Sequence, residues 1–479
     1  MGVGWVNQNS GPKTALIVLG FCLMGPHAAG SPRPQAQTNP HDLKLGARIK
    51  AYLAPFAETG NLSGVVLVAR HGRVLIRESY GMANYELNVP NSPGTRFHIA
   101  SVSKAFTAAA ILQLQEQGRL NISDRVSRFL PDFPRGNDIT IDNLLTHTSG
   151  IPDINDLPDY DAFARNPHKL SEIVAKFANL PLEYEPGTKY SYSNSNYNLL
   201  ALILQTITRQ SYSEILRLSV FQPARMTNSG HDGDVSKPIP LAAAGYVPAG
   251  LKGYDKAPYV DWSTKTGNGS LFSTIDDLFR FDRALKAGTL LKSSTCRTYF
   301  AEGDGNRYGW YIYRRSGHLL MAAKGRSPGF TAELDRYPDD DLTVIVLSNS
   351  YSSVAQDPVV AAIAAIAFGE RATIPNVRAV IMPQSTLSSY EGHYQFGSNF
   401  FSPNERFQLV AKPGYLLMQF ADREQPLIPL GPTEFLDRKF FGHVAAEKDG
   451  QGKVTGLIVR YGAQDFHAVR LDAEPAFEQ

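Results

Sequence analysis

Cysteine and metal-binding patterns are scarce in this chain of 479 residues. Its two cysteines, Cys22 and Cys296, cannot form a disulfide framework. Its 11 histidines make no His-Glu-x-x-His pair and no cluster with cysteine, which argues against a structural or catalytic metal. A glycine-rich phosphate loop followed by Lys and Ser or Thr is also missing. We therefore expect a protein that works without a metal or another cofactor.

An excess of charge of one sign is absent as well. Lys and Arg number 47 against 45 Asp and Glu, a net charge of +2, which argues against a nucleic-acid partner. Hydrophobic residues at 43% and charged residues at 19% exclude a disordered chain, and the length is ample for a sizeable core. The composition predicts one large globular domain and a smaller one.

The apolar run at residues 15–24 is too short to span a membrane, which takes about 20 apolar residues. It follows Lys13 and precedes the small residues Ala28-Ala29-Gly30. This pattern is typical of a secretory signal peptide cleaved near Ala29, and the alternative is an N-terminal core helix. We predict a signal peptide over residues 1–29, a periplasmic or secreted protein, and no transmembrane span in the mature chain.

Strand patterns occur near both ends of a large first domain. After a helical spacing of apolar residues over 42–58, residues 64–70 and 74–78 form the pattern of a β-hairpin. Four more strands are predicted at 308–313, 318–323, 330–336 and 342–347. The long section between them is mostly helix and loop. These elements predict an α+β domain over residues 40–372, an antiparallel sheet flanked by helices with an inserted, mostly helical region.

A second pattern follows a linker over residues 373–388. Short strand runs separated by turn residues occur at 390–394, 407–411, 415–420, 440–446, 454–461 and 466–471. Closely spaced strands of this kind predict a small all-β barrel or sandwich. We place this second domain at residues 389–473.

The most informative chemical pattern is Ser101-Val102-Ser103-Lys104. The Ser-x-x-Lys spacing brings both side chains to one face of a helix, and the apolar residues 105–112 indicate that this helix is buried. A buried lysine is desolvated, which disfavours its charged form and lets it act as a base toward the serine hydroxyl. Alone the string is weak, since a chain of this length contains one by chance about once. The alternative is a capped helix with a surface lysine.

A second polar element lies at Tyr192-Ser193-Asn194, before a helical run at 197–206. It offers a phenol for proton relay and an amide for holding a substrate. Aromatic and polar residues are common on loops, so this pattern alone is not specific. Together, a serine, a lysine and a tyrosine are the parts of an acyl-transfer site that needs neither histidine nor aspartate.

Several segments, in order, resemble one enzyme superfamily. Residues 97–107 (Phe-His-Ile-Ala-Ser-Val-Ser-Lys-Ala-Phe-Thr) resemble the active-site segment of serine β-lactamases and penicillin-binding proteins. The similarity is closest to the branch of class C β-lactamases, D-aminopeptidases, D-Ala-D-Ala carboxypeptidases and related esterases. Further matching segments lie at 118–124, 130–134, 141–152, 190–198, 269–278 and 347–349. The resemblance covers residues 40–370.

The resemblance implies a β-lactamase/transpeptidase-like fold and a serine hydrolase that cleaves an amide (a β-lactam or a D-amino-acid peptide) or an ester. It implies Ser101 as the acylated nucleophile, Lys104 as its base, Tyr192 as proton relay and Asn194 in the substrate cleft. The implied oxyanion hole consists of the backbone N–H groups of Ser101 and Arg326. The expected partner is a small molecule or a short peptide. Two alternatives stay open: a penicillin-recognising binder or sensor that acylates without turnover, and an esterase only.

The third motif of the superfamily, Lys-Thr-Gly or His-x-Gly, is altered in this chain. Lys265-Thr266-Gly267 matches it as a string but precedes a segment that resembles a different family element. In the equivalent strand, 319–326, ungapped register puts Ala323 at the cation position, whereas a shift by one residue would seat Lys324 there. We expect Lys324 and Arg326 to bind substrate, and in ungapped register we expect neutral esters or amides to be preferred over penicillins.

A second serine string, Gly325-Arg326-Ser327-Pro328-Gly329, matches the nucleophile elbow Gly-x-Ser-x-Gly. An elbow needs a backbone N–H after the serine, which Pro328 lacks, and a strand–turn–helix, whereas residues 330–336 are predicted to form a strand. We therefore do not expect Ser327 to be the nucleophile.

The C-terminal region resembles the lipocalin-like β-domain appended to many members of this branch, through residues 390–394 and 452–458. Its aromatic residues, among them Tyr394 and Phe396, are expected in the core of a barrel rather than around a ligand. Two roles stay open for this domain, shaping the cleft and mediating assembly, and the sequence does not decide between them.

Overall fold

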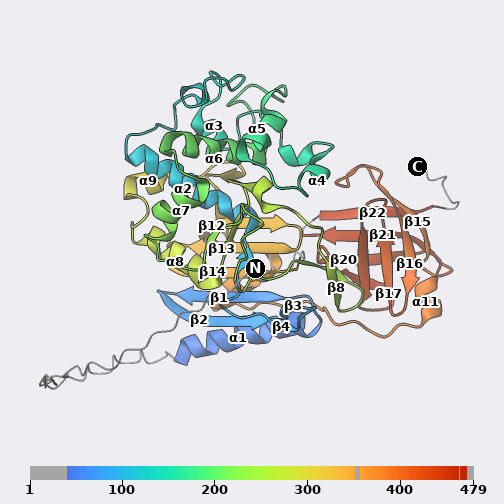
Figure 1. Cartoon of the computed structure of the whole chain (residues 1–479). Helices are drawn as coiled ribbons and strands as arrows, with labels where there is room; N and C mark the ends of the chain where they lie inside the picture. Colours follow the sequence, from blue (N-terminus) through green and yellow to red (C-terminus); the bar gives the residue numbers. More distant parts are fainter. Residues whose placement is uncertain (1–39, 351–356, 463, 472–479) are drawn as a thin grey trace, which may run out of the picture. The chain divides into compact units, whose positions relative to one another are not determined.

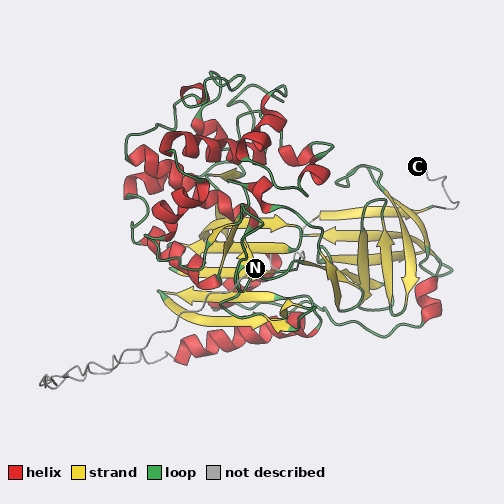
Figure 2. Ribbon diagram, viewed as in Figure 1, coloured by secondary structure: helices red, strands yellow, loops and turns green. Residues whose placement is uncertain are grey.

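The structure is a computed structural model that describes residues 40–350, 357–462 and 464–471. The predicted signal peptide, residues 1–29, lies outside these ranges. Figures 1 and 2 show a sheet with helices on both faces, followed by a C-terminal barrel of strands. Within the described ranges, no helix combines the length and the apolar character that a membrane crossing requires.

A seven-stranded sheet forms the centre of the first part of the chain, in the order β10-β11-β12-β13-β14-β1-β2. Its strands are β1 (Gly64–Arg70), β2 (Arg73–Tyr80), β10 (Asn306–Arg307), β11 (Trp310–Arg315), β12 (His318–Ser327), β13 (Phe330–Tyr337) and β14 (Leu342–Ser348). All neighbours are antiparallel, which confirms the predicted sheet. Because β1 pairs with β14 along its whole length, the two ends of the first domain meet in one sheet and the chain between them is an insertion.

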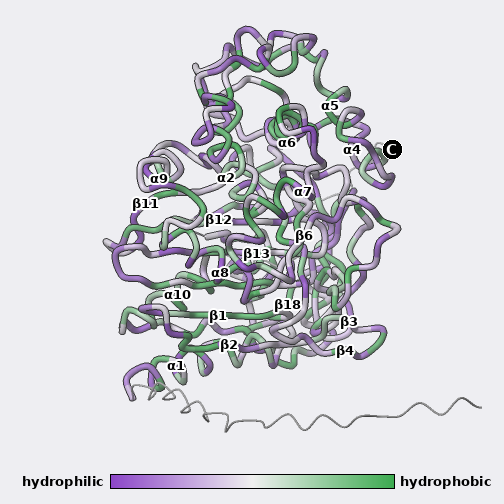
Figure 3. The backbone as a smooth tube through the Cα atoms, turned by 60° about the vertical axis from the view of Figure 1, so that its left-hand side comes forward, coloured by the Kyte–Doolittle hydropathy of each residue, from purple (hydrophilic) through white to green (hydrophobic). Residues whose placement is uncertain are grey.

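Alternate residues of β1 face two separate cores. Val65 and Leu67 contact the core that holds α2 (Ser103–Glu116) and α8 (Ile275–Lys286). Val66 and Val68 contact the other core, which holds α1 (Pro40–Glu58) and α10 (Asp357–Ala367). Since both faces are covered, β1 is a continuous apolar run rather than an alternating one, and Figure 3 shows it in green.

The insertion between β2 and β10 is mostly helical, as predicted. Its remaining helices are α3 (Ile141–Leu145), α4 (Tyr160–Phe163), α5 (Leu170–Ala178), α6 (Asn194–Thr208), α7 (Tyr212–Leu216) and α9 (Ser293–Tyr299). Short strands pair within it: β3 (Met82–Asn84) with β4 (Val89–Pro90), β9 (Leu271–Ser273) with β5 (Phe97–His98) and β6 (Gly230–His231), and β7 (Tyr246–Ala249) with β8 (Gly253–Lys256). Helix α2 contacts α6, and the turn that precedes α2 contacts β12, so α2 joins the insertion to the sheet (Figure 1).

The predicted C-terminal all-β barrel is confirmed. Eight strands close into a barrel: β15 (Gly392–Phe396), β16 (Arg406–Lys412), β17 (Tyr415–Gln419), β18 (Glu424–Pro429), β19 (Glu434–Asp437), β20 (Gly442–Lys448), β21 (Val454–Tyr461) and β22 (Gln464–Arg470). Two of them, β18 and β19, were not predicted, because β18 contains Pro426 and Pro429, which cannot donate to a ladder, and β19 has only four residues. The resemblance of this barrel to a lipocalin stays a prediction.

The stretch predicted as a linker, residues 373–388, ends in helix α11 (Gln384–Ser388). Leu387 of this helix is buried in the barrel core, and Val377 earlier in the stretch is buried in the core that holds α1. The stretch therefore contacts both parts that it connects. The domain boundaries at 40–372 and 389–473 stay predictions.

Arg438 ties the barrel to the first part of the chain. Its side chain is fully buried, and its guanidinium donates hydrogen bonds to five oxygen atoms. These are the carbonyl oxygens of Gly60, Ala249, Gly250 and Gly253, at 2.7 to 3.1 Å, and the side-chain oxygen of Asn61 at 3.3 Å. All five belong to the first part of the chain.

Candidate active site

Ser101 lies where the chain enters the core. It is the middle residue of a 3₁₀ turn, Ala100–Val102, which runs directly into α2 at Ser103. Ala100 has a φ of 44°, in the left-handed region that a residue with a β-carbon rarely adopts. Backbone strain of this kind is frequent at active sites. Ser101 is partly exposed, whereas residues 102–112 are buried, so the serine is the accessible end of a buried helix.

Three oxygen atoms surround the side-chain nitrogen of Lys104, which is fully buried. Its Nζ lies 3.0 Å from Ser101 Oγ, 2.8 Å from Asn194 Oδ1 and 2.9 Å from the carbonyl oxygen of Asn268. Burial lowers the pKa of Lys104 well below its usual 10.5, and the carboxylate of Asp153 partly opposes this shift. The Ser-x-x-Lys spacing thus brings a hydroxyl and a desolvated amine into contact.

Tyr192 approaches Ser101 from the loop before α6. Its hydroxyl donates a hydrogen bond to Ser101 Oγ at 3.0 Å, and burial raises the pKa of the phenol well above 10. Its ring stacks on His147 with the centroids 4.4 Å apart. His147 Nδ1 accepts the backbone N–H of Ser193 at 3.1 Å, and burial lowers the pKa of His147 to about 3. His147 is therefore a neutral ring that holds the tyrosine in place.

Asn194, the first residue of α6, connects Lys104 to Asp153. Its Oδ1 accepts from Lys104, and its Nδ2 donates to both carboxyl oxygens of Asp153, at 3.2 and 2.9 Å. Burial raises the pKa of Asp153 above its usual value. Asn194 is 7% exposed, so its amide is engaged in this network, and its expected place in the substrate cleft stays a prediction.

The small residues of β12 face the turn that holds Ser101. A β-carbon on Gly325 would lie 2.2 Å from the carbonyl oxygen of Ile99 and 3.0 Å from the nitrogen of Ser101, so only glycine fits there. Ala323 is fully buried in the same core as α2. These contacts favour the ungapped register, in which Ala323 occupies the position of the family's cation.

Lys324 points to the opposite face of the sheet from Ala323 and Gly325. It stands opposite Glu333 of β13, with Nζ 3.8 Å from Glu333 Oε1. The rings of Tyr311 and Tyr313 lie beside it, each centroid 5.9 Å from Nζ. A substrate-binding role of Lys324 stays a prediction.

The backbone N–H of Arg326 points away from β13. A two-residue turn joins Ser327 to Phe330, so these two residues form the hydrogen-bonded pair that closes the hairpin. Bonded and non-bonded pairs alternate in an antiparallel ladder, so Arg326, opposite Thr331, turns its N–H away from β13. On the other side of β12, strand β11 pairs with it only as far as Ala322.

Ser327 and Lys265 belong to two other segments whose sequences match catalytic motifs. Ser327 ends β12 and is 4% exposed, in a strand–turn–strand rather than a strand–turn–helix. Lys265 ends the 3₁₀ helix Trp262–Lys265, and its Nζ donates to the hydroxyl of Tyr160 at 3.1 Å. Among the described residues, Ser101 Oγ accepts hydrogen bonds from Lys104 and Tyr192, and from neither of these two side chains.

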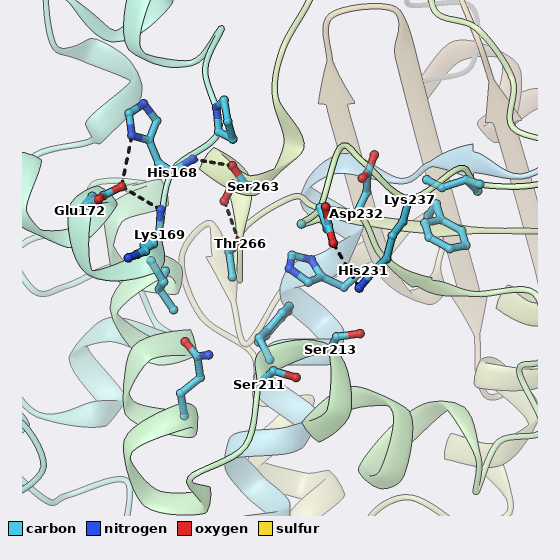
Figure 4. A pocket seen from close by; sticks show the side chains of 18 of the residues that line it. His168, Lys169, Glu172, Ser211, Ser213, His231, Asp232, Lys237, Ser263 and Thr266 are labelled. Atoms are coloured by element: carbon cyan, nitrogen blue, oxygen red, sulfur yellow. Dashed lines mark hydrogen bonds and ion pairs between the residues drawn. The ribbon is translucent and has the colours of Figure 1, made fainter. Parts of the chain in front are cut away.

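A separate cavity of about 1000 Å³ is lined in part by Ser263 and Thr266. In Figure 4, His168 and Glu172 face His231, Asp232 and Lys237 across it. The lining contains none of the predicted site residues, and we assign it no part in the reaction.

Two contributors to the site were not found in the sequence. Asp153 follows directly after the Leu-Thr-His-Thr-Ser-Gly-Ile-Pro segment, and its contact with Asn194 spans 41 positions. Asn268 contributes a backbone oxygen across 164 positions, which no side-chain pattern reveals. The position of Asp153 beside a matching segment was the one available signal.

The fold and the site together define a serine hydrolase. A family model described as Beta-lactamase matches residues 49–367, more than half of the chain, and the chain belongs to this family. It is 32% identical over 295 residues to the protein PbpX of Bacillus subtilis, which covers 61% of this chain and 72% of the relative.

Solved structures show the same fold. A penicillin-binding protein from Bacillus halodurans is 27% identical with a TM-score of 0.57, covering 67% of this chain and 98% of that chain. A D-amino acid amidase from Ochrobactrum anthropi is 23% identical with a TM-score of 0.59, covering 64% of this chain and 92% of that chain. The predicted superfamily is thereby confirmed.

Proposed function

We propose that the chain cleaves an amide or an ester through an acyl-enzyme on Ser101, with Lys104 and Tyr192 as its base system. The hydrogen-bond partners of Lys104 Nζ are the main support for this proposal. Two of its neighbours are the carbonyl oxygens of Asn194 and Asn268, which can only accept hydrogen bonds. They take the two N–H bonds of a neutral amine, and the lone pair is then left facing the hydroxyl of Ser101.

Acylation begins when Lys104 Nζ accepts the proton of Ser101 Oγ as that oxygen bonds to the substrate carbonyl carbon. The carbonyl π electrons move to its oxygen, and the N–H groups of Ser101 and Arg326 stabilise the negative charge. When the C=O bond re-forms, the bond to the leaving nitrogen or oxygen breaks. The leaving atom receives the proton through Tyr192, which Lys104 reprotonates. The products are an acyl-serine, a neutral lysine and a free amine or alcohol.

Hydrolysis of the acyl-enzyme follows the same route in reverse. Tyr192 and Lys104 remove a proton from water as its oxygen bonds to the acyl carbon. The Ser101 oxygen then leaves the carbon and takes back the proton. A carboxylic acid is released, and the free enzyme is restored.

For the substrate we propose a small molecule or short peptide that presents no carboxylate to the Ala323 position, such as a D-amino-acid amide or a simple ester. The fold shared with a D-amino acid amidase supports the first, and the methyl group of Ala323 at the cation position supports the absence of a recognised carboxylate. A second candidate is a penicillin-recognising binder that acylates without turnover, which the similarity to a penicillin-binding protein favours.

Labelling with a fluorophosphonate probe tests the nucleophile, with peptide mapping by mass spectrometry. Ser101→Ala should remove both the adduct and the turnover of nitrophenyl esters and D-aminoacyl anilides. Ser327→Ala is the matched control and should keep both. An adduct mapped to Ser327 in the wild type would contradict the assignment. A burst of product without steady release would favour the binder.

We also propose that the chain is exported. The apolar run at residues 15–24 and the small residues near Ala29 support this location. N-terminal sequencing of the protein recovered from the culture medium or periplasm should begin near residue 30.

A further inference from the structure

A cavity of about 440 Å³ lies between the catalytic strand and the barrel. One wall is Arg326, the residue after Gly325, which packs on the Ser101 nitrogen. Side chains alternate along a strand, so the Arg326 side chain points to the face of β12 opposite Gly325. Its backbone N–H belongs to the proposed oxyanion hole, so the cavity starts at a residue that would hold the substrate carbonyl. The opposite wall consists mainly of aromatic residues of the barrel, among them Phe400, Phe401 and Tyr461.

Phe401 presents a large apolar surface to this cavity. Its side chain is 70% exposed, although its ring lies 5.3 Å from Phe400 and 4.9 Å from Phe466, between centroids. Phe400 in turn stacks on Phe396 of β15 at 3.7 Å. The exposed ring thus rests on a layer of buried rings, and a second apolar group placed against it would be removed from water.

The loop that carries Phe400 and Phe401 is held by backbone hydrogen bonds. The N–H of Gly397 donates to the carbonyl oxygen of His467 at 3.0 Å, and the carbonyl oxygen of Gly397 accepts from Phe400 and Asn404, both at 3.3 Å. A loop fixed in this way does not have to be ordered when a ligand arrives, which favours binding.

Two of the polar side chains that line the cavity already have partners. Arg423 donates to both carboxyl oxygens of Glu405, at 2.8 and 2.7 Å, and the Tyr461 hydroxyl donates to Asp437 at 2.7 Å. A charged ligand would have to compete with these bonds, whereas an apolar one leaves them intact. The chemistry of the lining therefore selects an apolar group.

We propose that the barrel supplies a subsite for an apolar, ring-bearing group of the substrate, next to the carbonyl that Ser101 attacks. This inference rests on the proposed function, because it needs the carbonyl to be held at Ser101 and Arg326. It assigns the barrel a role in substrate selection.

Thioesters of three kinds test the subsite through the thiol that they release. S-ethyl thioacetate is the small reference. S-ethyl 4-phenylbutanethioate extends the acyl side, and S-(3-phenylpropyl) thioacetate extends the leaving side. For at least one extended ester, kcat/KM should be higher than for the reference by a factor on the order of ten. Phe401→Ala should bring this ratio close to one. Val469→Ala, an exposed apolar residue of β22 outside the cavity, is the matched control and should keep the ratio.

A wild-type ratio close to one for both extended esters would overturn the inference, as would a gain that Phe401→Ala leaves intact. In either case turnover of S-ethyl thioacetate that disappears in Ser101→Ala would leave the proposed function standing. Absence of turnover for all three esters would overturn the proposed function and the subsite with it.

Discussion

The two segments that meet at Ser101 differ in what they contribute. The helical side places three polar side chains in contact, those of Ser101, Lys104 and Tyr192. The strand side faces them with Ala323 and Gly325, which have no polar side-chain atom. In the proposed reaction, proton transfer depends on side chains of the helical side, and recognition of a substrate carboxylate would depend on a side chain of the strand side. The proposal therefore combines a full set of groups for acyl transfer with an altered place for substrate recognition.

Removal of the amine from the helical side should have the largest effect. In Lys104→Met the serine loses its base, and we expect kcat/KM for a nitrophenyl ester to fall by about 10³. Lys176→Met is the control, because Lys176 of α5 is half-buried and pairs with Asp159, away from Ser101. A loss of less than tenfold in Lys104→Met would mean that another group takes the proton.

Restoration of a cation on the strand side should have a smaller effect on selectivity. A carboxylate brought to Ala323 is desolvated without a partner, and a histidine there would supply one. We expect Ala323→His to raise the ratio of kcat/KM for penicillin G to that for p-nitrophenyl butyrate by about tenfold.

The expected result depends on whether Ala323 or Lys324 of β12 occupies the cation position, and Lys324→Ala is the control. We expect that variant to leave the ratio within about twofold, because Lys324 faces Glu333. Efficient penicillin hydrolysis by the wild type, destroyed in Lys324→Ala, would show instead that Lys324 is the cation.

The pH dependence should show the smallest change. Only the neutral form of Lys104 accepts a proton, so kcat/KM should rise with pH through a pKa that burial has lowered well below 10.5. The pKa of Tyr192 is raised well above 10, so the phenol keeps its proton throughout. Between the pH at which this rise ends and pH 10, we expect kcat/KM to change by less than about twofold. A rising limb centred at 10.5, or a fall before pH 10, would contradict the proposed base system.

The parts of the fold and site that could be predicted are those determined locally. Ser101 and Lys104 are three positions apart on one helix, so their contact follows from helical geometry. β1 and β14 were recognisable because both are buried on two faces and apolar throughout. By contrast, the place of Asn268 depends on a contact across 164 positions. The register of β12 is favoured only by the fit of Gly325 against Ile99, which the sequence alone does not show.

The buried guanidinium of Arg438 affects how readily the barrel separates from the first part of the chain. Its charge belongs to the barrel, but the five oxygen atoms that compensate it belong to the other part of the chain. Separation would leave a desolvated charge and several carbonyl groups without partners, each at a cost of about 1–3 kcal/mol where water does not replace them. A protease that cuts within residues 373–388 should therefore yield a nicked protein whose two fragments stay associated and melt in a single transition.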